Sequence, residues 1–174
     1  MLFRSTLRGT EVGLRARGNL RATQLEAETD TTRDRGHLTL EAGGSGGTSP
    51  ALQLEATQLS GHTIRIMANG AVALERVHAQ AGTDGAPGEI GIVARSPANA
   101  AAATLNLRDV TLKGGGVTLS ATGDLQADAL LSQAQRHWLR AGSGTLHGEG
   151  DLLLNNTALR GPSSGGTAAA AQMI

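Results

Sequence analysis

The chain of 174 residues has no cysteine and no tyrosine, and its only other aromatic residues are Phe3 and Trp138. The lack of cysteine excludes disulfides, thiolate catalysis and Cys-ligated metal sites, but it leaves the redox compartment open. Aromatic side chains normally fill the irregular space of a globular core. Leu, Val, Ile and Ala must build this core instead. They suit stacks of like side chains in a regular array, and they do not suit a site that grips sugars or bases by stacking.

The chain also lacks an excess of charge of either sign, since 15 basic residues balance 15 acidic ones. This balance argues against a nucleic-acid partner and against a basic membrane-binding face. No stretch approaches the ~20 apolar residues that a membrane span needs, so membrane insertion is not expected. The start of the chain carries Arg4 and Arg8 where a signal peptide would keep its apolar run. We therefore expect either a cytoplasmic chain or a piece of a longer protein with its own export signal.

An internal repeat is the strongest positive feature of the sequence, because the motif aliphatic-x-aliphatic-x-Ala recurs with a nearly constant step of about 26 residues. Its copies are Val12-Leu14-Ala16, Leu38-Leu40-Ala42, Ile64-Ile66-Ala68, Ile90-Ile92-Ala94 and Val117-Leu119-Ala121. A degenerate sixth copy, Leu139–Ala141, follows after a shorter step. A second set of apolar alternations lies about half a step after the first, beginning at Leu25, Leu52, Val77, Leu105, Leu130 and Leu152. A third, shorter set includes Leu20-Ala22, Val72-Leu74 and Leu125-Ala127.

Each motif has the period-2 alternation of a strand with one buried face. We therefore predict an all-β, right-handed parallel β-helix of about six coils, with roughly 26 residues and three short strands per coil. Antiparallel hairpins in a sandwich are the alternative, but sandwich strands rarely hold one step four times running. Glycines precede many motifs, as in Gly36-His37-Leu38 and Gly123-Asp124-Leu125, and we expect them at corners with positive φ.

The predicted repeat domain covers residues 1–161, and residues 162–174 form a low-complexity tail that we expect to be disordered. The segment 96–103 lengthens one loop. The segment 128–140 has an apolar pattern that also fits an amphipathic helix. The register of the second set of alternations favours a strand that opens at Leu130.

No group of residues forms a convincing active site. Five histidines occur, at 37, 62, 78, 137 and 147. His37 and His62 are expected near one edge of neighbouring coils, but zinc normally takes three or four protein ligands. The run Gly43–Gly47 lacks the Gly-Lys-Ser/Thr ending of a phosphate-binding loop. Asp84 with Glu89 offers too few oxygens for calcium. The sequence thus predicts no catalytic, cofactor-binding or metal-ligating residue and no cofactor.

Catalysis on polysaccharides, which parallel β-helices also perform, would need paired carboxylates on one face. The acidic residues instead look scattered. Glu41 and Glu55 alternate outward from predicted strands, and Asp109, Asp124 and Asp151 fall at strand ends or corners. We therefore expect that the chain is not an enzyme.

The phrases "GHLTLEA", "GGGVTLSATGDLQADALL" and "GEGDLLLNNTALRG" resemble the repeat region of filamentous haemagglutinin-type exoproteins. These are the two-partner secretion adhesins and contact-dependent inhibition stems of Gram-negative bacteria. The similarity runs from about Thr10 to Gly161. The resemblance implies a β-helical shaft that projects a binding or toxic tip from the cell surface, without functional residues of its own. The chain departs from the family because it has no Asn-Pro-Asn secretion domain and no recognisable toxin domain, and its coils are longer than usual.

Three functions follow as hypotheses. The first is a structural shaft segment of a secreted, surface-located adhesin. It would contact neighbouring coils of a longer exoprotein and, through loops 43–50 and 94–103, host-cell or bacterial surface receptors. The second is a carbohydrate-active β-helix enzyme, which an acidic cluster on one face would favour. The third is a cytoplasmic, self-polymerising β-helix of the bactofilin kind. Because open coils expose unpaired strand edges, we also expect the isolated chain to self-associate.

Overall fold

The structure is a computed structural model that describes residues 1–31, 36–44, 49–83, 85–97, 101–142, 144–154 and 157–159. All regular structure in these ranges is β, and they contain no helix that could cross a membrane. The strands are β1 (Leu2–Phe3), β2 (Thr6–Arg8), β3 (Glu11–Ala16), β4 (Leu20–Thr23), β5 (Glu26–Glu28), β6 (His37–Ala42), β7 (Leu52–Gly61), β8 (Thr63–Asn69), β9 (Val72–Thr83), β10 (Ala86–Pro87), β11 (Glu89–Arg95), β12 (Leu105–Ala121), β13 (Leu125–Ala141), β14 (Gly144–Leu154) and β15 (Thr157–Leu159). The segment 128–140 is therefore a strand, as its register predicted.

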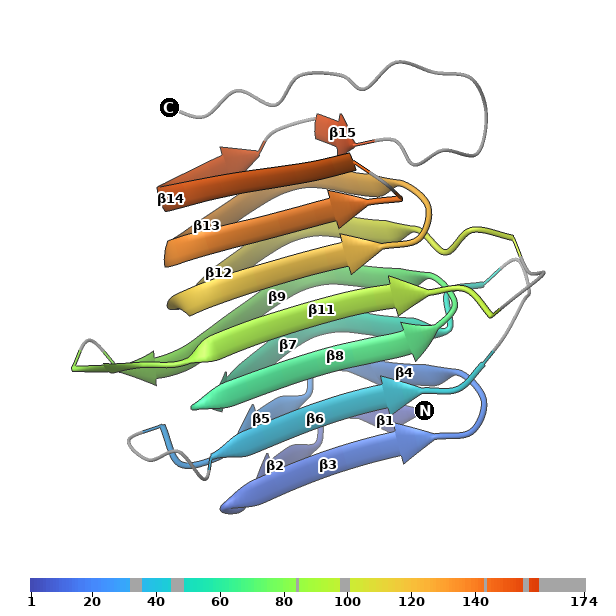
Figure 1. Cartoon of the computed structure of the whole chain (residues 1–174). Coiled ribbons are helices and arrows are strands. Elements are labelled where there is room, and N and C mark those ends of the chain that lie inside the picture. The colour runs from blue at the N-terminus through green and yellow to red at the C-terminus, as the bar shows by residue number, and fades with distance from the viewer. Residues whose placement is uncertain are drawn as a thin grey trace.

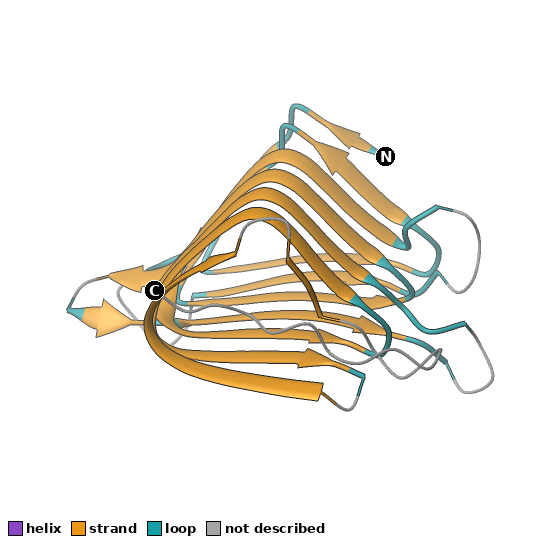
Figure 2. Ribbon diagram, turned by 90° about the horizontal axis from the view of Figure 1, so that it is seen from above, coloured by secondary structure: helices purple, strands orange, loops and turns teal. Residues whose placement is uncertain are grey.

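The parallel strands curl into one sheet with three faces, stacked along the molecule in Figure 1 and seen end-on in Figure 2. Face A contains β3, β6, β8, β11 and the C-terminal parts of β12 and β13. Face B contains β1, β4 and the first residues of β7, β9, β12 and β13. Face C contains β2, β5 and the later residues of β7 and β9 with the middle of β12 and β13. The long strands bend from one face to the next.

The core is a set of aliphatic ladders that run through the interior from strand to strand. On face A the inward residues Leu40, Ile66, Ile92 and Leu119 lie side by side, and all are fully buried. Each fully buried Leu, Ile or Val contributes roughly 1.5–3 kcal/mol relative to an exposed one. The predicted aliphatic core is confirmed, and Phe3 and Trp138 remain 60% and 52% exposed on the surface.

The register shows how the repeat step of the sequence arises. Equivalent positions on face A are evenly spaced along the chain except for the last, which comes early: Val12, Leu38, Ile64, Ile90, Val117 and His137. A circuit is one turn of the chain around the three faces, from a position on one face to its register partner on the same face. Equivalent positions on face B are unevenly spaced, because long and short circuits alternate: Leu20, Leu52, Val72, Leu105 and Leu125. The longer circuits add residues both between faces C and A and between faces A and B. Each face-A step contains one of these additions until the last, which contains none.

The corner between faces B and C is a column of residues in the left-handed backbone region. Six non-glycine residues there have φ between 44° and 56°, and the strand registers place them side by side: Arg4, Gln24, Ala56, Arg76, Asp109 and Ala129. We expected glycines with positive φ at the corners. Among the described glycines only Gly70, Gly82 and Gly142 have it. Stacking fixes this sharp bend although a Cβ is unfavourable there.

The glycines that precede the motifs instead allow neighbouring backbone segments to approach closely. A Cβ on Gly36 would lie 1.6 Å from the carbonyl oxygen of Asp30, and one on Gly88 would lie 1.9 Å from that of His62. The His62 N–H donates to the Gly36 carbonyl, and the Glu89 N–H donates to the His62 carbonyl. Glycine at 36 and 88 thus lets successive corners between faces C and A hydrogen-bond to one another.

The chain reverses direction after β13. Strands β14 and β15 pair antiparallel with β13, and Leu152 lies opposite Ser132. The prediction that Leu152 opens a further parallel strand is therefore wrong, because the same alternation fits both directions. Leu139 and Ala141 align with Leu119 and Ala121, so that copy keeps its second aliphatic residue and its alanine, and His137 takes the first position. The reversal covers the edge of β13, which we had expected to be open.

Candidate functional site

The histidines do not converge on a site. His37 opens β6 opposite Thr63, and His62 directly precedes that residue, so the two lie at neighbouring corners as expected. His78 points outward from face C, and His147 lies in β14 at a position whose side chain is not described. The described residues contain no group of three or more His, Cys, Asp or Glu side chains that could hold a metal ion.

His137 occupies a core position that is aliphatic in every other copy of the motif. Its side chain is 2% exposed, and its Nε2 lies 2.8 Å from the Oγ of Ser132, which is fully buried. Ser132 in turn aligns with Leu112 on face C. A buried polar pair of this kind requires mutual hydrogen bonding. Both side chains are buried inside the stack, so the pair contributes to core packing and is out of reach of a substrate.

The two loops considered for phosphate and calcium fall partly outside the described residues, since 45–48 and Asp84 are not described. Glu89, the second calcium candidate, has a structural partner instead. Its Oε1 lies 3.0 Å from Nη2 of Arg136, although Gly116 lies between the two strands. A Cβ on Gly116 would lie 2.1 Å from the Glu89 carboxylate. Glycine at 116 therefore leaves room for an ion pair that skips one strand.

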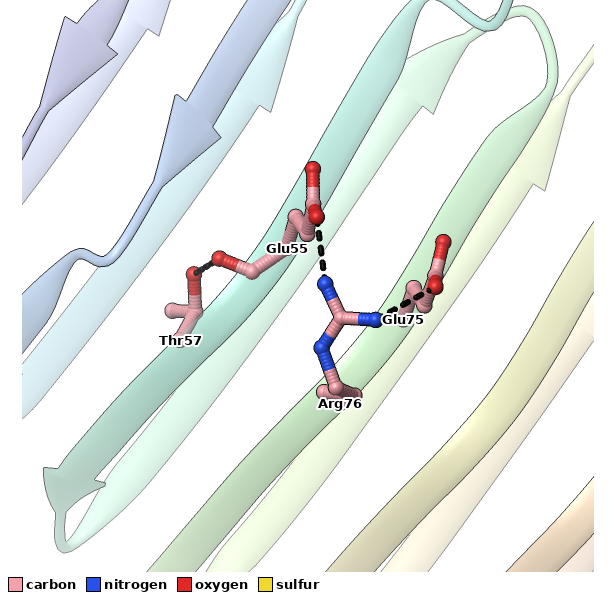
Figure 3. A network of polar contacts seen from close by, with 4 residues as sticks. All are labelled: Glu55, Thr57, Glu75 and Arg76. Carbon is pink, nitrogen blue, oxygen red and sulfur yellow. Dashed lines mark hydrogen bonds and ion pairs between the residues drawn. The ribbon is translucent and has the colours of Figure 1, made fainter.

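Charged side chains gather along the outer side of face B, next to the left-handed corner. Glu55 and Glu75 are register neighbours in β7 and β9, and the guanidinium of Arg76 lies between their carboxylates (Figure 3). Nη1 of Arg76 lies 2.7 Å from Oε1 of Glu75, and Nη2 contacts Glu55. The buried hydroxyl of Thr57 donates to the Glu55 carbonyl at 3.1 Å, which satisfies it inside the core. The left-handed backbone of Arg76 thus places its side chain over this column.

The same column continues in β12 and β13. Arg108 aligns with Glu75 on one side and Asp128 on the other, and its Nε lies 4.0 Å from Oδ2 of Asp128. The expectation that the acidic residues scatter is thus wrong for Glu55, Glu75 and Asp128, which share one column. Each of these three carboxylates has an arginine partner. The column is a ladder of carboxylates bridged by Arg76 and Arg108, and it does not present a pair of free carboxylates for glycoside cleavage.

Beside this ladder runs a groove of about 520 Å³ on the outer side of face B. It crosses β7, β9, β12 and β13. Its outward side chains form two register columns, Gln53, Ala73, Asn106 and Gln126 in the first and Glu75, Arg108 and Asp128 in the second. Sequence reasoning missed this groove. The first-column residues come from four different strands and are widely and unevenly separated along the chain, so no local motif marks them.

Comparison with protein-family models, with curated proteins and with solved structures finds no match to this chain.

Proposed function

We propose that the chain is a right-handed parallel β-helix of about six coils that serves as a shaft segment of a secreted adhesin of the filamentous haemagglutinin type. Its place would be the surface of a Gram-negative bacterium. The stacking of equivalent residues over faces A, B and C supports this proposal most strongly. Such stacking makes a rod whose length grows by ~4.8 Å with each added strand level.

The placement of the longer connections agrees with a display role. Two of them, β5 to β6 and β9 to β11, join face C to face A, and two others, β6 to β7 and β11 to β12, join face A to face B. In the first group, β10 folds back antiparallel on the end of β9, and Figure 1 shows this hairpin extending beyond the stack. Loops carried sideways from a rigid scaffold are the usual place for contacts with receptors. In this proposal the stack sets the distance from the cell surface, and the loops contact the partners.

The antiparallel return of β14 refines the proposal. A parallel coil cannot stack directly on β13, because β14 and β15 already pair with its edge. The segment would therefore lie where the stack of parallel coils ends, next to whatever the shaft carries.

Exposure on intact cells tests the proposal. The bacterium that carries this gene would be treated with proteinase K before lysis, and the segment followed with an antibody against the purified chain. We expect protease to remove the signal from intact cells while a cytoplasmic marker survives. Protection of the segment together with the cytoplasmic marker would reject the surface location.

A further inference from the structure

The groove on face B has the chemistry of a binding surface. Gln53, Asn106 and Gln126 present side-chain amides from three strands, and each amide both donates and accepts hydrogen bonds. Ala73 stands between Gln53 and Asn106 in the same column. Its short side chain leaves the floor of the groove open at that level.

The second column of the groove supplies charged groups with remaining hydrogen-bonding capacity. Arg108 has five N–H donors and meets Asp128 only at 4.0 Å. Glu75 uses one oxygen toward Arg76 at 2.7 Å, while a carboxylate has about four acceptor positions. Glu75, Arg108 and Asp128 sum to a single negative charge, so a polyanion is not favoured and a polycation gains little from so weak a field.

The backbone under the face-B groove is not available to a ligand. At these positions β9 pairs with both β7 and β12, and β12 pairs with both β9 and β13. An extended peptide that binds by adding a strand needs an unpaired edge, and the strands under the groove offer none. Recognition must use the side chains, which repeat along the stacking direction at ~4.8 Å.

We propose that the face-B groove binds a linear, uncharged oligosaccharide that lies along the stacking direction. Sugar hydroxyls donate and accept hydrogen bonds, as the amide column does, and they complement both the carboxylates and Arg108. The groove contains no aromatic side chain, so binding rests on hydrogen bonds without ring stacking. Binding is accordingly weak, with a dissociation constant on the order of 1 mM. The proposal concerns binding alone and does not depend on where the chain is located in the cell.

The test is a titration of the full ¹⁵N-labelled chain, followed by amide chemical shifts, with Gly13→Lys at the open edge of β3 on face A to limit self-association. Cellohexaose and β-1,4-mannohexaose are the uncharged probes, hexagalacturonate is the acidic probe, and a Gly-Ser hexapeptide is the peptide probe. We expect at least one uncharged hexasaccharide to shift face-B amides, with no saturable shift from the acidic or peptide probe. The variants Asn106→Ala and Gln126→Ala should each weaken binding roughly tenfold, since each removes a bidentate hydrogen-bonding group. Thr118→Ala, an outward change on face A, is the matched control and should leave the affinity unchanged.

Three results would overturn the proposal. The first is no saturable shift with either uncharged probe at about 10 mM, well above the expected dissociation constant. The second is equal or tighter binding of hexagalacturonate or the peptide. The third is binding that survives both amide deletions, which would place the ligand elsewhere. Circular dichroism and thermal melts of each variant confirm that the fold is intact.

Discussion

Replacing alanine by glycine should stabilise this protein at two positions of the left-handed column, although the same change weakens an ordinary strand. Ala56 and Ala129 have φ values of 48° and 56°. A residue with a Cβ loses roughly 1–2 kcal/mol in this region. Glycine loses about 0.5–1 kcal/mol relative to alanine through its greater freedom in the unfolded chain. The expected net gain is therefore about 0.75 kcal/mol for each substitution when the midpoints of the two ranges are subtracted, within limits of about 0–1.5 kcal/mol.

The two effects should add. Arg76 and Asp109 lie between Ala56 and Ala129 in the column, which places the two alanines three strand spacings, about 14 Å, apart. The double variant should gain about 1.5 kcal/mol, which raises Tm by roughly 3–6 °C in a chain of this size. Urea unfolding followed by circular dichroism measures the change in free energy of unfolding.

Ala73→Gly is the control, because Ala73 lies in β9 outside the left-handed column. It should lose about 0.5–1 kcal/mol, as glycine does in an extended strand. If Ala56→Gly and Ala129→Gly destabilise the protein as Ala73→Gly does, then residues 56 and 129 do not adopt positive φ and the corner is built differently.

Three further predictions follow from the core and the edges. Gly88→Ala should lower the free energy of unfolding by about 3 kcal/mol or more, because its Cβ would lie 1.9 Å from a carbonyl oxygen. Gly91→Ala, with no atom within 4 Å of its Cβ, should raise it by about 0.4–1 kcal/mol, and thermal melts compare the two. Ser132→Ala should lower the free energy of unfolding by about 1–3 kcal/mol, because it removes the hydrogen bond to buried His137. In a double-mutant cycle, Ser132→Ala with His137→Leu should recover most of that loss, and strict additivity would contradict the pairing. The purified chain should self-associate through the edge of β3, and Gly13→Lys should lower the mass of the assembly measured by light scattering. A monodisperse wild-type monomer at high concentration would refute this prediction.

The face-A ladder could be predicted because its signal is local and periodic. Val12, Leu38, Ile64, Ile90 and Val117 each open an aliphatic alternation, and a side-chain period of 2 identifies a strand whatever its neighbours are. His137 escaped this pattern, since a polar residue at an aliphatic position gives no strand signal. Its burial depends on Ser132, which reaches it only once β13 has bent around the corner between faces C and A.

Other features left no mark in the sequence for physical reasons. Ala56 and Arg76 are not residues that signal a left-handed corner, because glycine and asparagine usually fill that role. The alternation of β14 is the same in parallel and antiparallel pairing, so its reversal was not readable. The groove depends on unequal circuits, which bring Gln53, Asn106 and Gln126 into one column only after the extra loop residues are placed.

The parallel register itself can be tested by disulfide trapping, which the absence of native cysteine makes unambiguous. Gly91 and Thr118 are register partners on face A, although they lie a full coil apart in the sequence. Adjacent strands lie ~4.8 Å apart, within the range that a disulfide bridges. Gly91→Cys with Thr118→Cys should therefore cross-link fully under mild oxidation. The off-register pair Gly91→Cys with Ser120→Cys, about 8 Å apart, should not. Absence of the first cross-link, or equal yield from both pairs, would contradict the stacked parallel strands on which the proposed shaft depends.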